Sequence, residues 1–181
     1  MKTDVDLKLY SRLLHPYNAT LVSCRGKDGK PNVLAIAWII PVSVDPPLLA
    51  MSIRPERYSH KLISETKEFV VNIPTFQLAK KVLGCGRLSG RDHNKFDEFS
   101  LETKSAKKVS PPIIKDCIAH IECKLTKSLE AGDHTLMIGK VVAAYVTKDY
   151  FEEVYDLSKV RHCLHVGKNY FTTCDRTATG P

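Results

Sequence analysis

The pattern of apolar and polar residues predicts a chain built mainly of strands. Residues 117–129 alternate clearly, with Ile121, Cys123 and Leu125 on one face and polar side chains on the other, as in a strand with one buried face. The run 32–40 is almost entirely apolar, so we expect a single strand that is buried on both sides. Further strands are expected over residues 19–24, 48–53, 69–73, 135–146, 163–166 and 170–172.

Short helices are expected before and between these strands. Residues 3–14 contain a capping-box-like Thr3-x-x-Asp6 and four leucines, which predicts a short helix that ends before His15-Pro16. The other candidate helices are 59–65 with Ser59 as cap, 76–83 with Thr75 as cap and Gly84 as end, one turn within an ordered loop over 84–99, and 152–159.

This order of elements favours a mainly β fold, a closed antiparallel barrel with a few short helices. Tight turns connect the early strands, for example residues 27–30, where Gly29 is free to take a positive φ. A doubly wound sheet would instead need a helix after nearly every strand. A length of 181 residues suggests one domain, expected over residues 1–174, with a disordered tail over 175–181.

The net charge of +7 narrows the choice of partners only slightly. A basic chain is compatible with nucleic acid, an anionic membrane surface or a phosphorylated small molecule. The basic residues are interleaved with acidic ones, and no RNP-like motif, zinc finger or long arginine run is present, which disfavours nucleic acid. No apolar run reaches the roughly 18 residues of a membrane span, and the first residues lack the apolar core of a secretory signal. We therefore expect a cytoplasmic protein with no membrane partner.

The cysteines are expected to be buried thiols. They contain no C-x-x-C pair, and a chain of this length needs neither a disulfide nor a metal to fold. A zinc site built from His162, Cys163, His165 and Cys174 would lack the paired spacing of known zinc motifs, so no metal site is predicted. Glycine-rich dinucleotide and phosphate-loop fingerprints are also absent from the sequence.

Four segments carry candidate chemistry. They read PNVLAIAW at 31–38 followed by VDPPL at 44–48, SIRPERYSH at 52–60, LSGRDHNKF at 88–96, and GDHTLMIG at 132–139. In this order and spacing they resemble the flavin reductase-like FMN-binding split-barrel family, and most of all its flavoredoxin branch. The resemblance spans about residues 10–172 and implies a Greek-key split barrel with FMN as the cofactor.

The first segment offers a strand backbone to a flat ring. The small side chains of Ala35 and Ala37 let backbone amides come close to a ligand. The resemblance implies that this strand, from Asn32 onward, lines the isoalloxazine, with Ile36, Ala37 and Trp38 at the positions that face the pyrimidine edge. From composition alone, a buried hydrophobic strand with a tryptophan in the core is the simpler interpretation.

The second segment combines donors for a phosphate. Arg54, Arg57, Tyr58, Ser59 and His60 lie at the expected start of a helix, where hydrogen bonds, cationic side chains and the helix dipole all favour an anion. The resemblance implies that this loop grips the FMN phosphate. A solvated basic turn with a capping serine is the alternative.

The third segment is a candidate for the phosphate or the ribityl chain. The resemblance assigns this role to Ser89, Gly90, Arg91 and Lys95, and the nearby Phe96 suggests an ordered loop rather than free surface charge.

The fourth segment contributes one candidate catalytic residue, His134. The resemblance implies a place near the flavin and nicotinamide, where a histidine could stabilise negative charge on the reduced ring or position a hydride donor. A lone histidine at the start of a strand is more often structural. His15-Pro16 also matches the family pattern, with no role assigned.

The resemblance implies an FMN-dependent oxidoreductase, in a homodimer, that passes electrons from NAD(P)H to flavin, ferric or protein acceptors. Two alternatives stay open: a flavoredoxin-like electron carrier without its own NAD(P)H site, and a non-catalytic basic barrel that binds nucleic acid or a partner protein. Trp38, Ile39 and Ile40 stand where many flavin reductases have small or hydroxyl residues, which favours a tightly held FMN.

Overall fold

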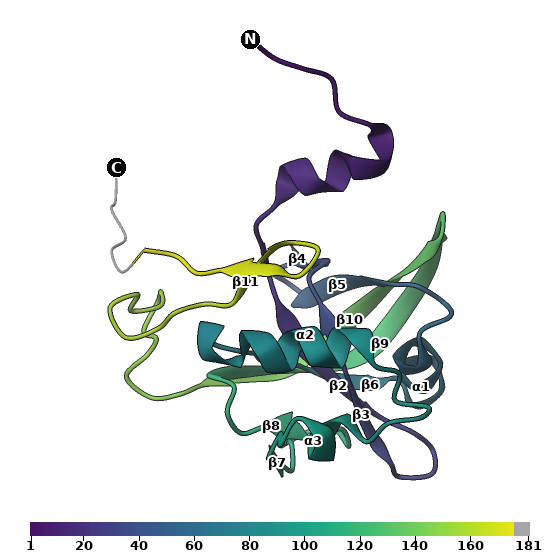
Figure 1. Ribbon diagram of the computed structural model, residues 1–181. Coiled ribbons are helices and arrows are strands. Elements are labelled where there is room, and N and C mark those ends of the chain that lie inside the picture. Colours follow the sequence, from purple (N-terminus) through teal and green to yellow (C-terminus); the bar gives the residue numbers. More distant parts are fainter. Residues whose placement is uncertain (176–181) are drawn as a thin grey trace.

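The computed structural model describes residues 1–175 and consists mainly of antiparallel strands (Figure 1). A seven-stranded sheet has the order β3-β2-β6-β9-β10-β5-β4. Its strands are β2 (Thr20–Arg25), β3 (Pro31–Ile36), β4 (Ile39–Ser43), β5 (Leu48–Ile53), β6 (Glu68–Ile73), β9 (Ala119–Ala131) and β10 (His134–Val146). A three-stranded sheet joins β1 (Tyr17–Asn18), β11 (Leu164–Gly167) and β12 (Tyr170–Thr172), and β7 (Thr103–Lys104) pairs with β8 (Ile113–Ile114).

The large sheet curls because its two edge strands are consecutive in the chain. β3 and β4 lie at opposite ends of the strand order, yet only Ala37 and Trp38 separate them. The carbonyl oxygen of Trp38 accepts a hydrogen bond of 2.9 Å from the amide of Ser52 in β5. In the described part of the chain, β3 and β4 do not pair with each other. The mainly β antiparallel class is therefore confirmed, whereas a barrel closed by hydrogen bonds stays a prediction.

The prediction of a single buried strand over residues 32–40 is wrong in its second half. The strand is interrupted at residues 37–38, and within residues 1–175 β4 pairs only with β5, so one edge of β4 has no described neighbour. As a result Ile40 is 59% exposed, although it belongs to a nearly continuous apolar run.

The first helix begins later than expected and lies on the surface. It is a 3-10 helix, η1 (Leu7–Leu14), and Asp6 rather than Thr3 caps it by accepting a 2.9 Å hydrogen bond from the Lys8 amide. None of its residues is buried. The segment stands apart from the sheet in Figure 1, above β4.

The other helices also differ at their ends. α1 (Tyr58–Thr66) has Arg57 as its N-cap, so Ser59 lies in the first turn. A short η2 (Phe76–Leu78) precedes α2 (Ala79–Arg87), and Thr75 makes no side-chain cap. Gly84 does not end α2: a Cβ there would lie 2.3 Å from the Phe99 ring, so this glycine allows close packing instead.

The loop over residues 84–99 contains the expected helical turn, α3 (Lys95–Glu98). A helix over 152–159 does not form. Phe151 and Tyr155 instead make an isolated antiparallel bridge, and their rings meet edge to face with centroids 5.1 Å apart. Except for Asp175, the tail expected to be disordered lies outside the described residues.

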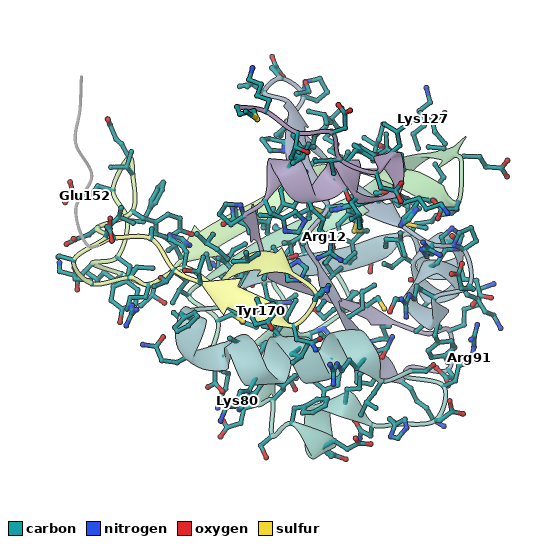
Figure 2. All side chains as sticks on the ribbon, turned by 45° about the horizontal axis from the view of Figure 1, so that its top comes forward. Arg12, Lys80, Arg91, Lys127, Glu152 and Tyr170 are labelled. Carbon is teal, nitrogen blue, oxygen red and sulfur yellow. The ribbon has the colours of Figure 1, made fainter. Side chains whose placement is uncertain are left out.

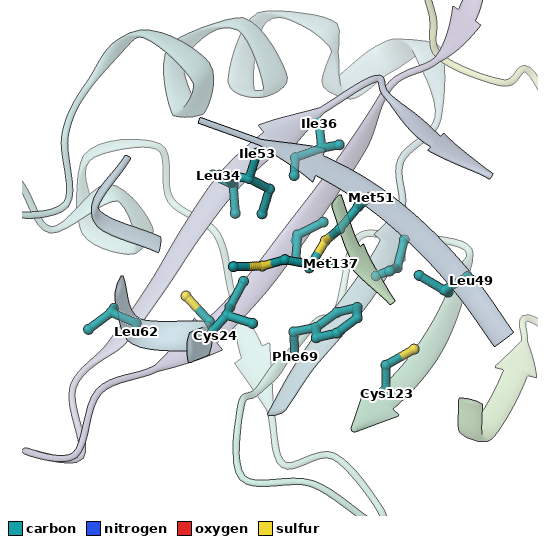
Figure 3. Packing of buried hydrophobic residues seen from close by; sticks show 13 residues of the cluster. Cys24, Leu34, Ile36, Leu49, Met51, Ile53, Leu62, Phe69, Cys123 and Met137 are labelled. Atoms are coloured by element: carbon teal, nitrogen blue, oxygen red, sulfur yellow. The ribbon is translucent and has the colours of Figure 1, made fainter. Parts of the chain in front are cut away.

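The core lies inside the curled sheet and under α2. Met51, Met137 and Phe69 fill the first of two buried clusters (Figure 3). The second cluster joins α2 and β3 through residues such as Val82 and Val33. Five of the six cysteines are buried and all six are free in the described structure, as expected of small apolar thiols. None of the helices within residues 1–175 is long and apolar enough to cross a membrane.

A buried polar network lies on the outer face of β9. Glu122 is fully buried and accepts hydrogen bonds of 2.7 and 2.6 Å from the amides of Lys107 and Lys108. The neighbouring His120 donates from Nδ1 to Asn72 Oδ1 at 2.9 Å, because that oxygen can only accept. Burial lowers the pKa of His120 to about 4, so its imidazole is neutral at pH 7. The opposite face carries Ile121, Cys123 and Leu125 into the core, as the alternation predicts.

Candidate functional site

Two adjoining cavities follow β3 along its length. The first has a volume of about 310 Å³ and lies where β3 passes into β4. The second, about 210 Å³, lies between β3, the start of α1 and the loop after α2. Both are lined by Leu34, Ala35 and Arg57, so together they form one trough.

The floor of the first cavity is the end of β3 and the two residues that follow. Ala35, Ile36, Ala37 and Trp38 all line it, as the sequence predicts. The side chains at 35 and 37 are only methyl groups, which brings the strand backbone close to the cavity. A flat ligand therefore has room to approach the backbone at this point.

Trp38, His134 and Arg54 line the first cavity, and Asp133, outside the lining, links the last two. His134, the first residue of β10, has its ring 5.0 Å from the Trp38 ring, with a 32° angle between the planes. His134 Nδ1 lies 2.6 Å from Asp133 Oδ1, and Asp133 Oδ2 lies 2.8 Å from Arg54 Nη2. The hydrogen bond to His134, together with the charge of Arg54, lowers the pKa of Asp133. Asp133 therefore stays a carboxylate and holds the Nδ1 proton, which leaves Nε2 of His134 as the free ring nitrogen.

Residues near the two ends of the described chain also line the first cavity. Arg12 and His15 line the cavity together with His165 of β11. His15 Nδ1 donates to the carbonyl oxygen of His165 at 3.0 Å, and the two rings meet edge to face at 5.1 Å. Sequence reasoning noted His15-Pro16 without a role and missed the other two. The pairing of β1 with β11 brings these two segments together. No local sequence pattern predicts that these two strands pair.

The second cavity is built from buried polar groups. Ser59 and Asn32 are buried, and the Asn32 amide nitrogen donates to Ser59 Oγ at 2.7 Å. A Cβ on Gly90 would lie 2.0 Å from Asn32 Oδ1, so only glycine permits this close approach. The Ser59 hydroxyl keeps its own proton, since it accepts from Asn32.

A buried ammonium group faces this cavity. Lys95 is 4% exposed, and its Nζ donates to the carbonyl oxygen of Cys85 at 2.9 Å. Burial lowers the pKa of Lys95, because the charged form loses its hydration. The ammonium retains two further donor protons for a ligand. A buried cation beside a cavity is stabilised by any anion that enters.

The rest of the lining is also strongly basic. Arg57, Arg87 and Arg91 line the second cavity, against a single carboxylate, Glu56. The Arg91 guanidinium lies 5.6 Å from the centroid of the Tyr58 ring and donates to the carbonyl oxygen of Glu56 at 3.2 Å. Such a set of donors matches a dianionic group such as a phosphate monoester.

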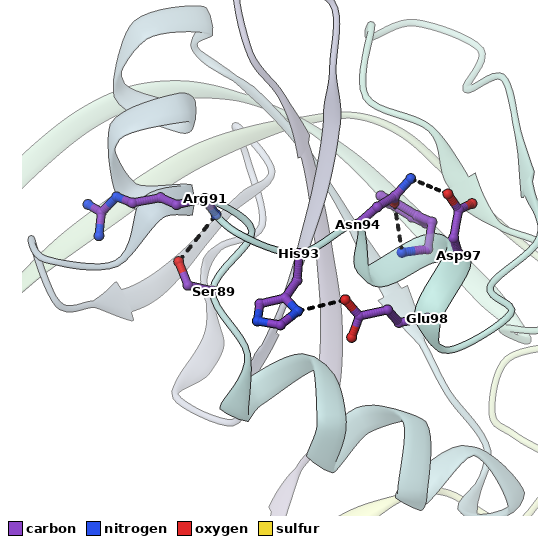
Figure 4. A network of polar contacts seen from close by, with 7 residues as sticks. Ser89, Arg91, His93, Asn94, Asp97 and Glu98 are labelled. Carbon is purple, nitrogen blue, oxygen red and sulfur yellow. Dashed lines mark hydrogen bonds and ion pairs between the residues drawn. The ribbon is translucent and has the colours of Figure 1, made fainter.

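The loop that carries Arg91 is ordered by its own hydrogen bonds. Figure 4 shows Ser89 Oγ accepting from the Arg91 amide, His93 bonded to Glu98, and Asn94 bonded to Asp97. The expectation of an ordered loop is confirmed.

The structure brings together all but one of the predicted site residues. Those lining the first cavity are Ala35, Ile36, Ala37, Trp38, Arg54, Arg57 and His134, and those lining the second are Asn32, Ala35, Arg57, Tyr58, Ser59, Ser89, Gly90, Arg91 and Lys95. His60 lies in neither cavity, because its Nε2 is 2.9 Å from Thr135 Oγ1 on β10. Arg54 lines the first cavity, not the second, basic one, and its guanidinium pairs with Asp133.

The chain was compared with known proteins. Residues 11–171 match the family model described as flavin reductase like domain. A protein of Archaeoglobus fulgidus is 42% identical over 146 residues, which covers 79% of this chain and 81% of that protein. A flavin reductase (NADH) of Kitasatospora aureofaciens is 35% identical over 133 residues, 71% of this chain and 65% of that enzyme.

Solved structures share the fold over almost the whole length. Flavoredoxin of Desulfovibrio vulgaris (Miyazaki F) superposes with a TM-score of 0.89 at 24% identity, covering 99% of this chain and 97% of that chain. An FMN-binding protein from Thermus thermophilus gives a TM-score of 0.87 at 23% identity, covering 100% and 98%.

Proposed function

Because the chain belongs to the flavin reductase-like family, we propose that it is an FMN-dependent oxidoreductase. The family predicted from the four sequence segments is confirmed by this match. In our proposal, NAD(P)H supplies electrons that pass through FMN to a flavin, ferric or protein acceptor. The observation that carries the proposal is the trough formed by the first and second cavities, one able to take a flat ring and the other a phosphate.

The phosphate is assigned to the second cavity. Its ligands would be the Ser59 hydroxyl, the Lys95 ammonium and the guanidinium groups of Arg57 and Arg91. Arg57 is the N-cap of α1 and Ser59 lies in its first turn, and Lys95 and Arg91 line the same cavity. The N-terminus of this helix also favours an anion. Arg54 is left out of this set because its guanidinium is paired with Asp133.

The flavin ring is assigned to the first cavity, over the floor formed by Ala35 to Trp38. His134 would present Nε2 to the ring side of this cavity, while Asp133 keeps its other nitrogen protonated. With Nδ1 already protonated, Nε2 would have to carry a second proton, as in an imidazolium, to stabilise negative charge that develops on a reduced ring. Hydride acceptance itself is chemistry that the cofactor supplies.

A homodimer is also part of the proposal. Trp38, which lines the first cavity, is partly exposed, and Ile40, Val42 and Val44 are exposed on and next to β4. The leucines of η1 are exposed as well. Exposed apolar side chains support a covering partner, and a second copy would shield the ring from water. The cytoplasmic location expected from the sequence stays a prediction.

Purified protein incubated with FMN and then desalted provides the test. Retained absorbance near the flavin band at about 450 nm supports the proposal, since protein-bound flavin absorbs there. Protein that leaves the column colourless after incubation with excess FMN would contradict it.

Rapid mixing with NADH or NADPH separates an enzyme from an electron carrier. Bleaching of the bound flavin by either nucleotide supports the reductase. Bleaching by dithionite alone would favour a flavoredoxin-like carrier, the second candidate, which the shared fold with flavoredoxin supports.

A further inference from the structure

A third cavity, of about 260 Å³, lies between β3, α2 and the β11–β12 hairpin. Figures 1 and 2 show this hairpin running beside α2. The cavity shares Ala35, Ile36, Ala37 and His165 with the first cavity, so the two adjoin along one wall. The flavin assignment above leaves this space unused.

The floor of the third cavity is apolar and firmly packed. Ala19 and Val82 belong to the second core cluster, and Phe171 packs against it. Such a floor favours an apolar body that leaves water. Pockets for drug-sized ligands usually measure about 300–1,000 Å³, so this smaller space fits a molecule with a single ring.

The rim of the cavity is positively charged. Arg87 is the last residue of α2, and Lys168 lies in the turn of the hairpin. No carboxylate lines the cavity. Within residues 1–175, neither of these two side chains makes a hydrogen bond or an ion pair with another side chain or backbone group. Both cations are thus available to an anion.

The turn that carries Lys168 is held in place. His165 Nε2 donates to the carbonyl oxygen of Lys168 at 3.2 Å. Gly167 has a φ of +130°, and a Cβ there would lie 2.1 Å from Arg12 Nη1. Burial lowers the pKa of His165, which favours its neutral form. The hairpin therefore presents Lys168 from a defined backbone.

From the apolar floor, the charged rim and the shared wall, we propose that the third cavity binds a small aromatic carboxylate beside the flavin. The ring of this ligand lies on Phe171 and Val82, and its carboxylate meets Lys168 and Arg87. The inference rests on the proposed function, because it assigns FMN to the first and second cavities and names the class of small molecule that binds next to it.

The test is a calorimetric titration of sodium benzoate into FMN-loaded protein. Benzamide, which has a similar shape but no charge, is titrated in the same way for comparison. We expect saturable benzoate binding with FMN retained, and binding of benzamide about tenfold weaker, as for a lost charged hydrogen bond. Asn169, next to Lys168, also lines the cavity, so a carboxylate placed there would repel the ligand's carboxylate. Lys168→Gln and Asn169→Asp should each weaken benzoate binding about three- to tenfold and leave benzamide binding unchanged. Lys80→Gln is the matched control, because Lys80 is an exposed residue of α2 that does not line the cavity (Figure 2).

Three results would overturn the inference: no saturable binding, equal benzoate affinity in Lys168→Gln and the parent protein, or release of FMN by benzoate. Flavin content is measured by absorbance on every sample. Protein that keeps FMN and ignores benzoate therefore refutes this inference alone. Protein that binds benzoate but never retains FMN counts against the flavin proposal instead.

Discussion

The rings of Trp38 and His134 lie 5.0 Å apart, centroid to centroid, in the lining of the first cavity. Trp38 is the only tryptophan of the chain. Its fluorescence therefore reports on this cavity alone. The pair joins the link between β3 and β4 to the first residue of β10, two positions that are far apart in the sequence.

Adding FMN to flavin-free protein should quench this fluorescence to saturation, because the isoalloxazine would lie against the indole. Riboflavin should quench as well, with weaker affinity, since it lacks the phosphate. A fluorescence titration measures both. If FMN binds fully but the tryptophan fluorescence does not change, the assignment of the flavin ring to the first cavity is wrong.

Lys95→Gln should weaken FMN binding about ten- to hundredfold, which corresponds to about 1.5–3 kcal/mol for a lost hydrogen bond to a charged group. The affinity for riboflavin should not change, because only the phosphate faces this side chain in our assignment. Lys61→Gln serves as the control, since Lys61 is exposed on α1 and pairs only with Glu65. Equal losses for FMN and riboflavin would indicate a general defect in folding rather than a phosphate contact.

Gly90→Ala should weaken FMN binding and lower the unfolding free energy by about 1–3 kcal/mol, the usual cost of overpacking to stability. The added methyl group would displace Asn32 and with it the hydrogen bond to Ser59. In an Asn32→Ala background the same change should cost much less, because the clashing amide is gone. This double-mutant cycle isolates the contact. If the losses of the two single variants simply add in the double variant, the proposed contact between residues 90 and 32 does not exist.

Unfolding free energy should fall as the pH drops from about 6.5 to about 4. His120 is held neutral in the folded protein, with its pKa near 4, whereas the unfolded chain takes up a proton below about 6.5. The unfolded state then binds more protons, so acid favours unfolding, by about 1–2 kcal/mol once solvent screening is allowed for. Urea denaturation at pH 7 and pH 4.5 measures the loss. His120→Gln keeps an amide donor for Asn72 and should reduce the loss, whereas an identical pH dependence would exclude His120 as its source.

The strands could be predicted from the sequence because their burial patterns are local. Cys123 and its neighbours alternate between the core and the covered outer face, and this alternation is visible in the residues themselves. The break at residues 37–38 could not be predicted in the same way. An apolar run has the same appearance whether it remains in one strand or crosses to the other edge of a curled sheet.

The candidate site was predicted where one segment supplies several of its groups. Ser59 and Lys95 come from segments whose composition suggests anion binding. Arg12 and His165 could not be found, because the pairing of chain ends places them there. Arg54 was assigned to the phosphate from its neighbours in the sequence, but its actual partner, Asp133, lies some 80 positions away in the chain.

The short covalent bridge at Ala37 and Trp38 has a consequence for the energetics of the whole chain. The trough is lined by β3 on one side of this link and by Ser52 and Ile53 of β5 on the other. β3 and β5 are not paired with each other in the described sheet, so a molecule in the trough would contact both strands and favour the folded state alone. The gain in unfolding free energy would then rise with the logarithm of the ligand concentration, so the melting temperature would report how much of the protein has ligand bound.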